Sequence, residues 1–171
     1  IDLARALLLF QFDTENLEYI KQYETMLDLM ALQILTRLSP DSSDLEKIRA
    51  LNDFIFQQMQ FRFPPHSLYA HDIDLYTFLP SVLDNRQGVC LGVSILYLCL
   101  AQRLDLNLNI ITPPGHIYLS YSDKERVINI ETTSRGIDLP SEDYLGINNR
   151  NLQKRTIKEV IGLAFINQAS V

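Results

Sequence analysis

The sequence has no basic cluster and no long hydrophobic run, and these two absences exclude several classes of protein. Its 171 residues include 15 Lys and Arg against 21 Asp and Glu, a net charge of -6. This charge gives no support for a nucleic-acid surface or for binding to an anionic membrane. The apolar runs, ALLLF near the start and LGVSILYLCLA near the middle, are far shorter than the roughly 18 residues that a bilayer span needs. We therefore expect neither nucleic acid nor membrane as a partner.

Cysteine is scarce as well, and the two cysteines present cannot pair if residues 90–103 form a helix. Cys90 and Cys99 would then be separated by about 13.5 Å along the helix axis and by half a turn. A disulfide needs Cα atoms within about 7 Å of each other, so both thiols are expected to be free. Free thiols fit a reducing compartment, which predicts a cytoplasmic protein. Because the chain starts at Ile1 rather than methionine, we expect a fragment or a processed form.

Glycine and proline are few, 6 and 7 residues respectively, whereas 47% of the residues are hydrophobic. A chain of this length and composition can bury a substantial core as one domain. We expect residues 1–171 to form a single α+β domain in which a central buried helix packs on a small antiparallel sheet. Its parts are a helical N-terminal part over about 1–62, a site-bearing core over about 80–140 and a last helix over about 156–169.

Helical periodicity and capping patterns support the helical parts of this division. Apolar residues recur at close to helical spacing from Leu17 to Leu38, which predicts a long amphipathic helix over about 14–38. The S-x-x-E pattern of a capping box at Ser43 and Glu46 predicts a second helix that runs to about residue 60.

A second capping box is formed by Thr156 and Glu159, and it opens the last helix.

The stretch from Arg62 to Asn85 contains Pro64, Pro65, Pro80 and many polar residues, and it predicts a long loop with at most a short helical turn. Loops of this length in a compact domain are often functional.

The same loop contains His66, His71, Asp72 and Asp74, which leave a metal site open as an alternative. No fourth-ligand pattern accompanies them, and we expect neither a metal nor another cofactor.

The second half of the chain changes to a period of two, which is typical of strands. The runs HIYLSY (116–121) and RVINIE (126–131) predict two strands of a hairpin. PPGH (113–116) suits a type II turn with Gly115 at its third position, which would deliver His116 to the first position of a strand.

The register of this hairpin follows from the position of its turn. With the turn at 122–125, Tyr121 faces Arg126, and His116 faces Glu131. Directly opposed residues are close enough for an imidazole and a carboxylate to hydrogen-bond. A three-residue loop would break this pairing, and the pattern leaves that alternative open.

Cys90, His116 and Glu131 therefore form a candidate catalytic triad. Cys90 directly precedes the most hydrophobic segment of the chain, and at a helix N-terminus the unpaired N–H groups and the helix dipole favour a thiolate. The thiolate would act as nucleophile, His116 would transfer protons, and Glu131 would fix the histidine tautomer. The backbone N–H of Cys90 and a side-chain donor such as Gln87 would stabilise the oxyanion.

Each of these residues also has a purely structural interpretation. A single cysteine before an apolar helix is often a small buried residue, His116 can be a structural strand histidine, and Glu131 can be an edge-strand carboxylate. Cys99 lies between two leucines and is predicted to be core. Ser94 lacks the second glycine of a nucleophile elbow and is not a candidate nucleophile.

Three stretches of the chain together resemble the transglutaminase-like superfamily: RQGVCLGVSILYLCLAQRLDL, PPGHIYLSY and INIETTSRG. The resemblance extends over nearly the whole chain and is strongest from Arg86 to Gly136. It is closest to a bacterial branch in which helices precede the domain and a tetratricopeptide region follows it. The resemblance implies a papain-like α+β fold with cysteine, histidine and an acid in that order, matching Cys90, His116 and Glu131.

The resemblance also implies a function, with an alternative. The implied activity is amide or peptide hydrolysis, or acyl transfer, through a Cys90 thioester, with a peptide or protein as substrate. The alternative is a noncatalytic interaction domain that works with adjoining repeats, because some similar proteins lack the cysteine. The sequence departs from the superfamily pattern at Glu131, where Asp is usual, and at Leu91, where true transglutaminases have an aromatic residue. It also has no tryptophan.

Overall fold

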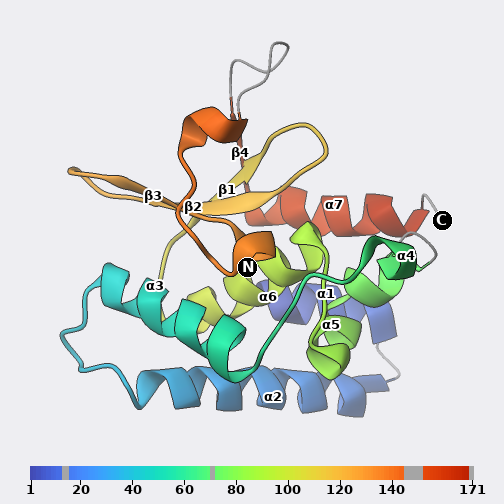
Figure 1. The fold of residues 1–171 in the computed structure, drawn as a ribbon. Helices are drawn as coiled ribbons and strands as arrows, with labels where there is room; N and C mark the ends of the chain where they lie inside the picture. Colours follow the sequence, from blue (N-terminus) through green and yellow to red (C-terminus); the bar gives the residue numbers. More distant parts are fainter. Residues whose placement is uncertain (13–15, 70–71, 145–151, 170–171) are drawn as a thin grey trace.

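The computed structural model describes residues 1–12, 16–69, 72–144 and 152–169. These residues form an α+β fold in which helices pack against a four-stranded antiparallel sheet (Figure 1). The helices are α1 (Leu3–Phe12), α2 (Leu17–Leu35), α3 (Asp44–Asn52), α4 (His66–Tyr69), α5 (Leu79–Asn85), α6 (Cys90–Arg103) and α7 (Ile157–Ala169). The strands are β1 (Asn109–Thr112), β2 (Tyr118–Ser122), β3 (Val127–Ile130) and β4 (Gln153–Arg155). The predicted α+β class is confirmed.

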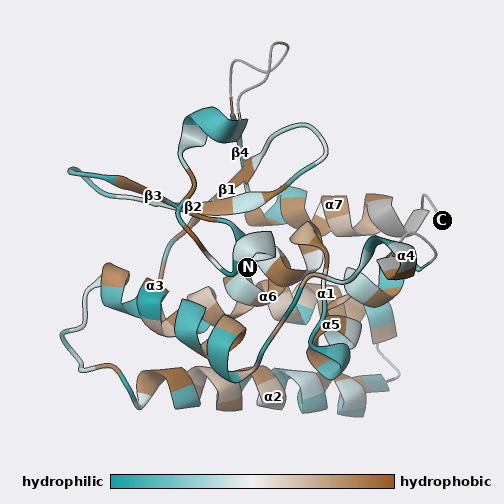
Figure 2. Ribbon diagram, in the orientation of Figure 1, coloured by the Kyte–Doolittle hydropathy of each residue, from teal (hydrophilic) through white to brown (hydrophobic). Residues whose placement is uncertain are grey.

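Helix α6 is the centre of the core. Every residue from Leu91 to Ala101 is buried, as expected for a helix that is apolar on nearly all sides. The helix contacts α1, α2, α3, α5 and β2, and the colouring of Figure 2 shows its hydrophobic character. The predicted central buried helix is therefore present. No helix within the described part of the chain is long and apolar enough to cross a membrane.

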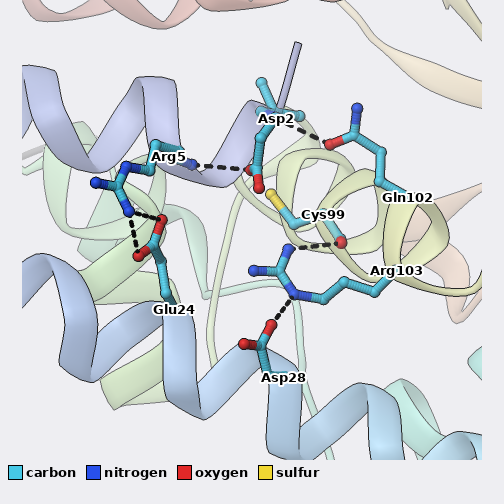
Figure 3. Close-up of polar contacts among 8 residues, drawn as sticks. Asp2, Arg5, Glu24, Asp28, Cys99, Gln102 and Arg103 are labelled. Atoms are coloured by element: carbon cyan, nitrogen blue, oxygen red, sulfur yellow. Dashed lines mark hydrogen bonds and ion pairs between the residues drawn. The ribbon is translucent and has the colours of Figure 1, made fainter.

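Polar contacts fix the C-terminal end of α6 (Figure 3). The Nε atom of Arg103 donates a 2.7 Å hydrogen bond to Asp28 of α2, and the side-chain oxygen of Gln102 accepts one from the backbone N–H of Leu3. Cys99 lies in this same turn, fully buried, and burial raises the pKa of its thiol. This end of α6 therefore has a structural role.

The predicted helical boundaries are confirmed at their capping boxes. The Ser43 backbone N–H lies 2.8 Å from a carboxylate oxygen of Glu46, and the reciprocal bond to the Ser43 hydroxyl is also present. Helix α3 begins there and continues as a π-helical turn, η2 (Asp53–Gln58). Helix α2 is shorter than the predicted range of 14–38, part of which lies outside the described residues.

The last helix also begins at its predicted capping box. Thr156 donates its backbone N–H to Glu159 at 2.7 Å, and Glu159 donates its own N–H back to the Thr156 hydroxyl.

The prediction of a long loop over 62–85 is wrong. This segment contains α4, a 3-10 helix η3 (Ile73–Tyr76) and α5. Pro80 lies in the first turn of α5, where a helix requires no backbone N–H donor, so it starts the helix instead of breaking it. Arg86 ends α5 in the left-handed conformation, with φ of 53°.

The strands of the sheet follow the order β3-β2-β1-β4. The hairpin prediction is confirmed for β2 and β3, but its register is wrong: Leu119 pairs with Ile130, not with Ile128. The hydrogen bond from Asp123 N to Arg126 O places the turn at 123–126, one residue later than predicted. Because the error amounts to two residues in the partner strand, every side chain stays on its predicted face.

Both faces of the hairpin are covered. Leu119 and Ile130 on one face belong to the hydrophobic core. On the other face, Tyr118 stacks on Tyr144, with ring centroids 3.9 Å apart, and the Asn129 amide donates to the carbonyl oxygen of Leu139 at 2.7 Å. The segment that follows β3 therefore covers the second face of the hairpin and supplies a hydrogen-bond partner for the buried Asn129 side chain.

The start of α6 is fixed by a close backbone contact with η3. The carbonyl oxygen of Tyr76 accepts a 2.9 Å hydrogen bond from Val89 N. A Cβ atom added to Gly92 would lie only 2.2 Å from this oxygen. Glycine at position 92 thus allows η3 to approach the first turn of α6, and this contact positions Cys90.

Candidate active site

Cys90 is the first residue of α6, as the sequence predicted. The preceding residue, Val89, provides no side-chain cap. The first backbone N–H groups of a helix have no acceptor within the helix, so their partial positive charge is directed toward the region of the Cys90 side chain. Cys90 is partly exposed, whereas Cys99 is buried, and both thiols are free. The structure therefore gives the two cysteines different environments.

His116 is delivered to the site by a tight turn. The His116 backbone N–H donates to the Pro113 carbonyl oxygen at 3.1 Å, and Gly115 has a φ of +70°. These features fit the predicted type II turn, in which the third position requires a positive φ. His116 is not the first residue of a strand, however, because β2 begins two residues later at Tyr118.

Glu131 directly follows β3 and is almost completely buried, with 3% exposure. Its Oε2 atom lies 2.7 Å from His116 Nε2 and accepts a 2.8 Å hydrogen bond from the Tyr144 hydroxyl. Its Oε1 atom accepts hydrogen bonds from the backbone N–H and the hydroxyl of Thr133. Both carboxylate oxygens are thus fully engaged, as a buried charge requires.

The contact between His116 and Glu131 forms although the two residues are not directly opposed. Extending the observed register by one pair would place Tyr118 opposite Glu131, so His116 lies on the diagonal. Diagonal neighbours are about 7–8 Å apart, which long side chains still bridge. The longer side chain of Glu, compared with Asp, suits this span.

Hydrogen bonds to Cys90 and to Glu131 raise the pKa of His116 to about 9, although partial burial opposes the charge. Burial alone would raise the pKa of Glu131. The hydrogen bonds from His116, Thr133 and Tyr144 outweigh burial and hold its pKa below the usual value. These shifts favour an imidazolium–carboxylate pair at neutral pH. Because Nε2 binds the carboxylate, Nδ1 is the ring nitrogen left to face the thiol.

Cys90 and His116 open into a cleft of about 500 Å³. The cleft lies between the first turn of α6, the β1–β2 turn, β4 and α7. Its described lining residues are Cys90, Leu91, Thr112, Pro113, Pro114, Gly115, His116, Ile117, Gln153, Arg155, Leu163 and Ile166. A substrate in this cleft would have direct access to both the thiol and the imidazole.

The sequence also suggested Gln87 as an oxyanion donor and left open a metal site in the segment 62–85. Gln87 is half-buried and forms a parallel bridge with Arg62, and it is not among the described residues that line the cleft. His71 lies outside the described residues. Within the described ranges, no group of three or more His, Cys, Asp or Glu side chains could hold a metal ion.

A second layer of residues, which sequence reasoning missed, supports the acid. The Asn52 amide donates to the carbonyl oxygen of Gly136 at 3.1 Å and accepts from the Tyr97 hydroxyl at 3.0 Å. Gly136 N in turn donates to the Glu131 carbonyl oxygen at 2.8 Å. Asn52 thus links α3 and α6 to the turn that carries Glu131. The hydroxyl of Tyr144 was also missed, because it lies thirteen positions after the acid in the sequence.

A cysteine on a buried helix next to a histidine and a carboxylate from an antiparallel sheet is consistent with a transglutaminase-like core. The chain matches the family model of the transglutaminase-like superfamily over residues 21–164 and therefore belongs to this superfamily. The matched range includes Cys90, His116 and Glu131. Comparisons with curated protein sequences and with solved structures gave no match.

Proposed function

We propose that the chain is a thiol-dependent enzyme domain that cleaves or transfers an acyl group through a Cys90 thioester, with an amide or peptide as substrate. The observation that supports this proposal most is the hydrogen-bonded series from Cys90 through His116 to Glu131, located where α6 meets the cleft. A structural cysteine would require neither a charged histidine beside it nor an accessible cleft.

In the first step, the Cys90 thiolate attacks the carbonyl carbon of the substrate, forming a C–S bond and a tetrahedral oxyanion. The His116 imidazolium then donates its Nδ1 proton to the leaving nitrogen. The C–N bond breaks, and an amine leaves while a thioester remains on Cys90. Glu131 stabilises the imidazolium before this transfer and fixes the ring orientation afterwards.

In the second step, neutral His116 accepts a proton from water or from an acceptor amine, which attacks the thioester carbonyl. The C–S bond breaks, the thiolate is regenerated, and the imidazolium forms again. Water gives hydrolysis and an amine gives transfer, so the same residues serve both outcomes. Which outcome dominates depends on access of the acceptor to the cleft.

The oxyanion requires hydrogen-bond donors near Cys90. The backbone N–H of Cys90 is one candidate, because the first N–H groups of α6 have no intrahelical acceptor. The Gln87 side chain, three residues earlier, is the proposed second donor. It would have to turn toward the cleft when substrate binds, since Gln87 does not line the cleft in the described structure.

A direct test is to react the protein with p-nitrophenyl acetate and to measure its intact mass. The proposal predicts a burst of p-nitrophenol and one acetyl group on Cys90. Cys90→Ser should abolish both, whereas the matched control Cys99→Ser should retain both, because Cys99 is buried at the other end of α6. No burst in the wild type would favour the alternative of a noncatalytic interaction domain that works with adjoining tetratricopeptide repeats.

Two free thiols also favour a reducing, cytoplasmic compartment.

A further inference from the structure

The cleft beside Cys90 has an apolar wall and a cationic end. Four of its described lining residues form much of the apolar wall: Leu91, Ile117, Leu163 and Ile166. At β4, by contrast, the lining contains Arg155. A ligand that fits this cleft must therefore combine an apolar group with a group that can accept hydrogen bonds from a guanidinium.

Arg155 is held in a fixed orientation by its neighbours. Its Nε donates to the Thr112 hydroxyl at 2.8 Å, one terminal nitrogen donates to Glu159 at 3.3 Å, and the other donates to the side-chain oxygen of Gln153. Each nitrogen uses one N–H in these contacts, and each terminal nitrogen carries a second N–H. A planar guanidinium fixed in this way needs little reordering to bind a carboxylate.

The charges around the cleft also favour an anion. Its described lining residues include Arg155 and His116 but no Asp or Glu. The nearest carboxylate partner of Arg155 is Glu159, on the first turn of α7, and its side chain is 46% exposed. An exposed ion pair of this kind is weak, so a carboxylate ligand can compete with Glu159 for the guanidinium. Glu131 is the partner of His116, but its side chain is only 4% exposed, and it is not among the described residues that line the cleft.

We propose that this cleft accepts acyl substrates that carry a carboxylate next to an apolar group, and that Arg155 is the residue that selects the carboxylate. The carboxylate can belong to an Asp or Glu side chain or to the C-terminus of a peptide. The proposal rests on the proposed function in one respect: it takes Cys90 as the reacting group.

Three chloroacetyl dipeptides can serve as probes, since each alkylates a thiolate irreversibly without requiring turnover. Chloroacetyl-Leu-Glu-amide carries a side-chain carboxylate, chloroacetyl-Leu-Gln carries a C-terminal carboxylate, and chloroacetyl-Leu-Gln-amide is neutral. The second-order rate of Cys90 alkylation is measured for each by intact mass. We expect one of the two anionic probes to react about tenfold faster than the neutral probe, as expected for a hydrogen-bonded charged group. The preferred probe identifies the source of the carboxylate.

Two variants should shift this preference in opposite directions. Arg155→Gln removes the cation and should reduce the anionic preference, the ratio of anionic to neutral rates, toward unity. Glu159→Gln removes the partner charge while keeping the capping geometry of α7, and it should increase the preference. Arg126→Gln removes one positive charge from the exposed β2–β3 turn and is the matched control, with no change expected. Should Arg155→Gln not fold, the Glu159→Gln result still tests the proposal.

The outcomes separate this proposal from the proposed function. If Cys90 reacts rapidly and equally with all three probes, or if Arg155→Gln leaves the preference intact, the role of Arg155 is overturned while the reactive thiol stands. If Cys90 reacts no faster than glutathione with any probe, the reactive thiol itself is overturned, and the role of Arg155 falls with it.

Discussion

His116 Nε2 lies 2.7 Å from Glu131 Oε2, although Tyr118 is the residue that the β2–β3 register would place opposite Glu131. A diagonal contact of this kind depends on side-chain length. The additional methylene of Glu131, compared with Asp, suits the span to His116.

We expect Glu131→Asp to impair the site almost as much as Glu131→Gln does. The shorter side chain would leave His116 without its partner, and the glutamine would provide a hydrogen bond without charge, so both variants should slow alkylation of Cys90 at pH 6. Adding His116→Ala to Glu131→Gln should cause no further loss, because both changes act through the same ion pair. Circular dichroism and thermal melting check the fold. Unchanged labelling in Glu131→Gln would remove Glu131 from the site.

Cys90 should react with iodoacetamide much faster than Cys99. Cys90 is partly exposed beside His116, whereas burial raises the pKa of Cys99. Limited labelling of the folded protein between pH 5 and 8, mapped by mass spectrometry, measures the two rates. Labelling in denaturant should make the rates similar. Equal rates in the folded protein would contradict the assignment of Cys90 as nucleophile.

The charge of His116 should persist to about pH 9. Hydrogen bonds to Cys90 and Glu131 raise its pKa to about 9, above an unfolded value near 6.5. Because the pKa of His116 is higher in the folded than in the unfolded protein, its protonation stabilises the fold. This contribution is complete below about pH 6.5 and is lost as pH rises through about 9. The imidazole NMR signal should titrate near pH 9 in the wild type and at lower pH in Glu131→Gln. A wild-type midpoint near 6.5 would show that no ion pair forms.

Tyr144→Phe should weaken the site without removing any charge. The Tyr144 hydroxyl is one of the donors to the buried Glu131 carboxylate, and its loss should raise the pKa of Glu131. We expect a loss of about 1–2 kcal/mol in the free energy of unfolding. Tyr19→Phe, at an exposed position of α2, is the control. An unchanged Glu131 titration in Tyr144→Phe would restrict Tyr144 to a packing role.

Gly92→Ala should disturb Cys90 through the backbone. The added Cβ would lie 2.2 Å from the Tyr76 carbonyl oxygen, and we expect a destabilisation of about 1–3 kcal/mol together with slower Cys90 labelling. Gly162→Ala on α7 is the matched control, because its Cβ would meet nothing within 4 Å. That variant should be neutral or slightly stabilising. Equal chemical denaturation curves for the two variants would refute the close contact at Gly92.

The sequence predicted those features that depend on local chemistry. The two capping boxes, the turn before His116 and the position of Cys90 at a helix start each follow from a few neighbouring residues, and the structure contains all of them. The β2–β3 register was wrong, because it depends on which four residues close the turn. The choice between 122–125 and 123–126 is settled by the Asp123 side chain, which accepts hydrogen bonds from two backbone N–H groups within the turn.

Features that depend on distant parts of the chain could not be predicted. Strand β1 is four residues long, and β4 has only three. Both are too short to show a period. The link from Asn52 to Gly136 joins residues 84 positions apart, and no local pattern marks it. Nothing in the sequence distinguishes Arg155 from other charged residues. Its position in the cleft results from the pairing of β4 with β1.

The candidate triad is divided between two layers, with Cys90 on a helix and both His116 and Glu131 on the sheet side of the cleft. The distance from the Cys90 thiol to the His116 imidazole therefore depends on how closely α6 packs against the sheet. Small displacements at a reacting pair reduce rates strongly, and local opening precedes global unfolding in most proteins. On gradual heating, Cys90 reactivity should consequently decline while circular dichroism still records intact helices. The reactivity of this thiol would then report the loss of contact between the two layers before the helices unfold.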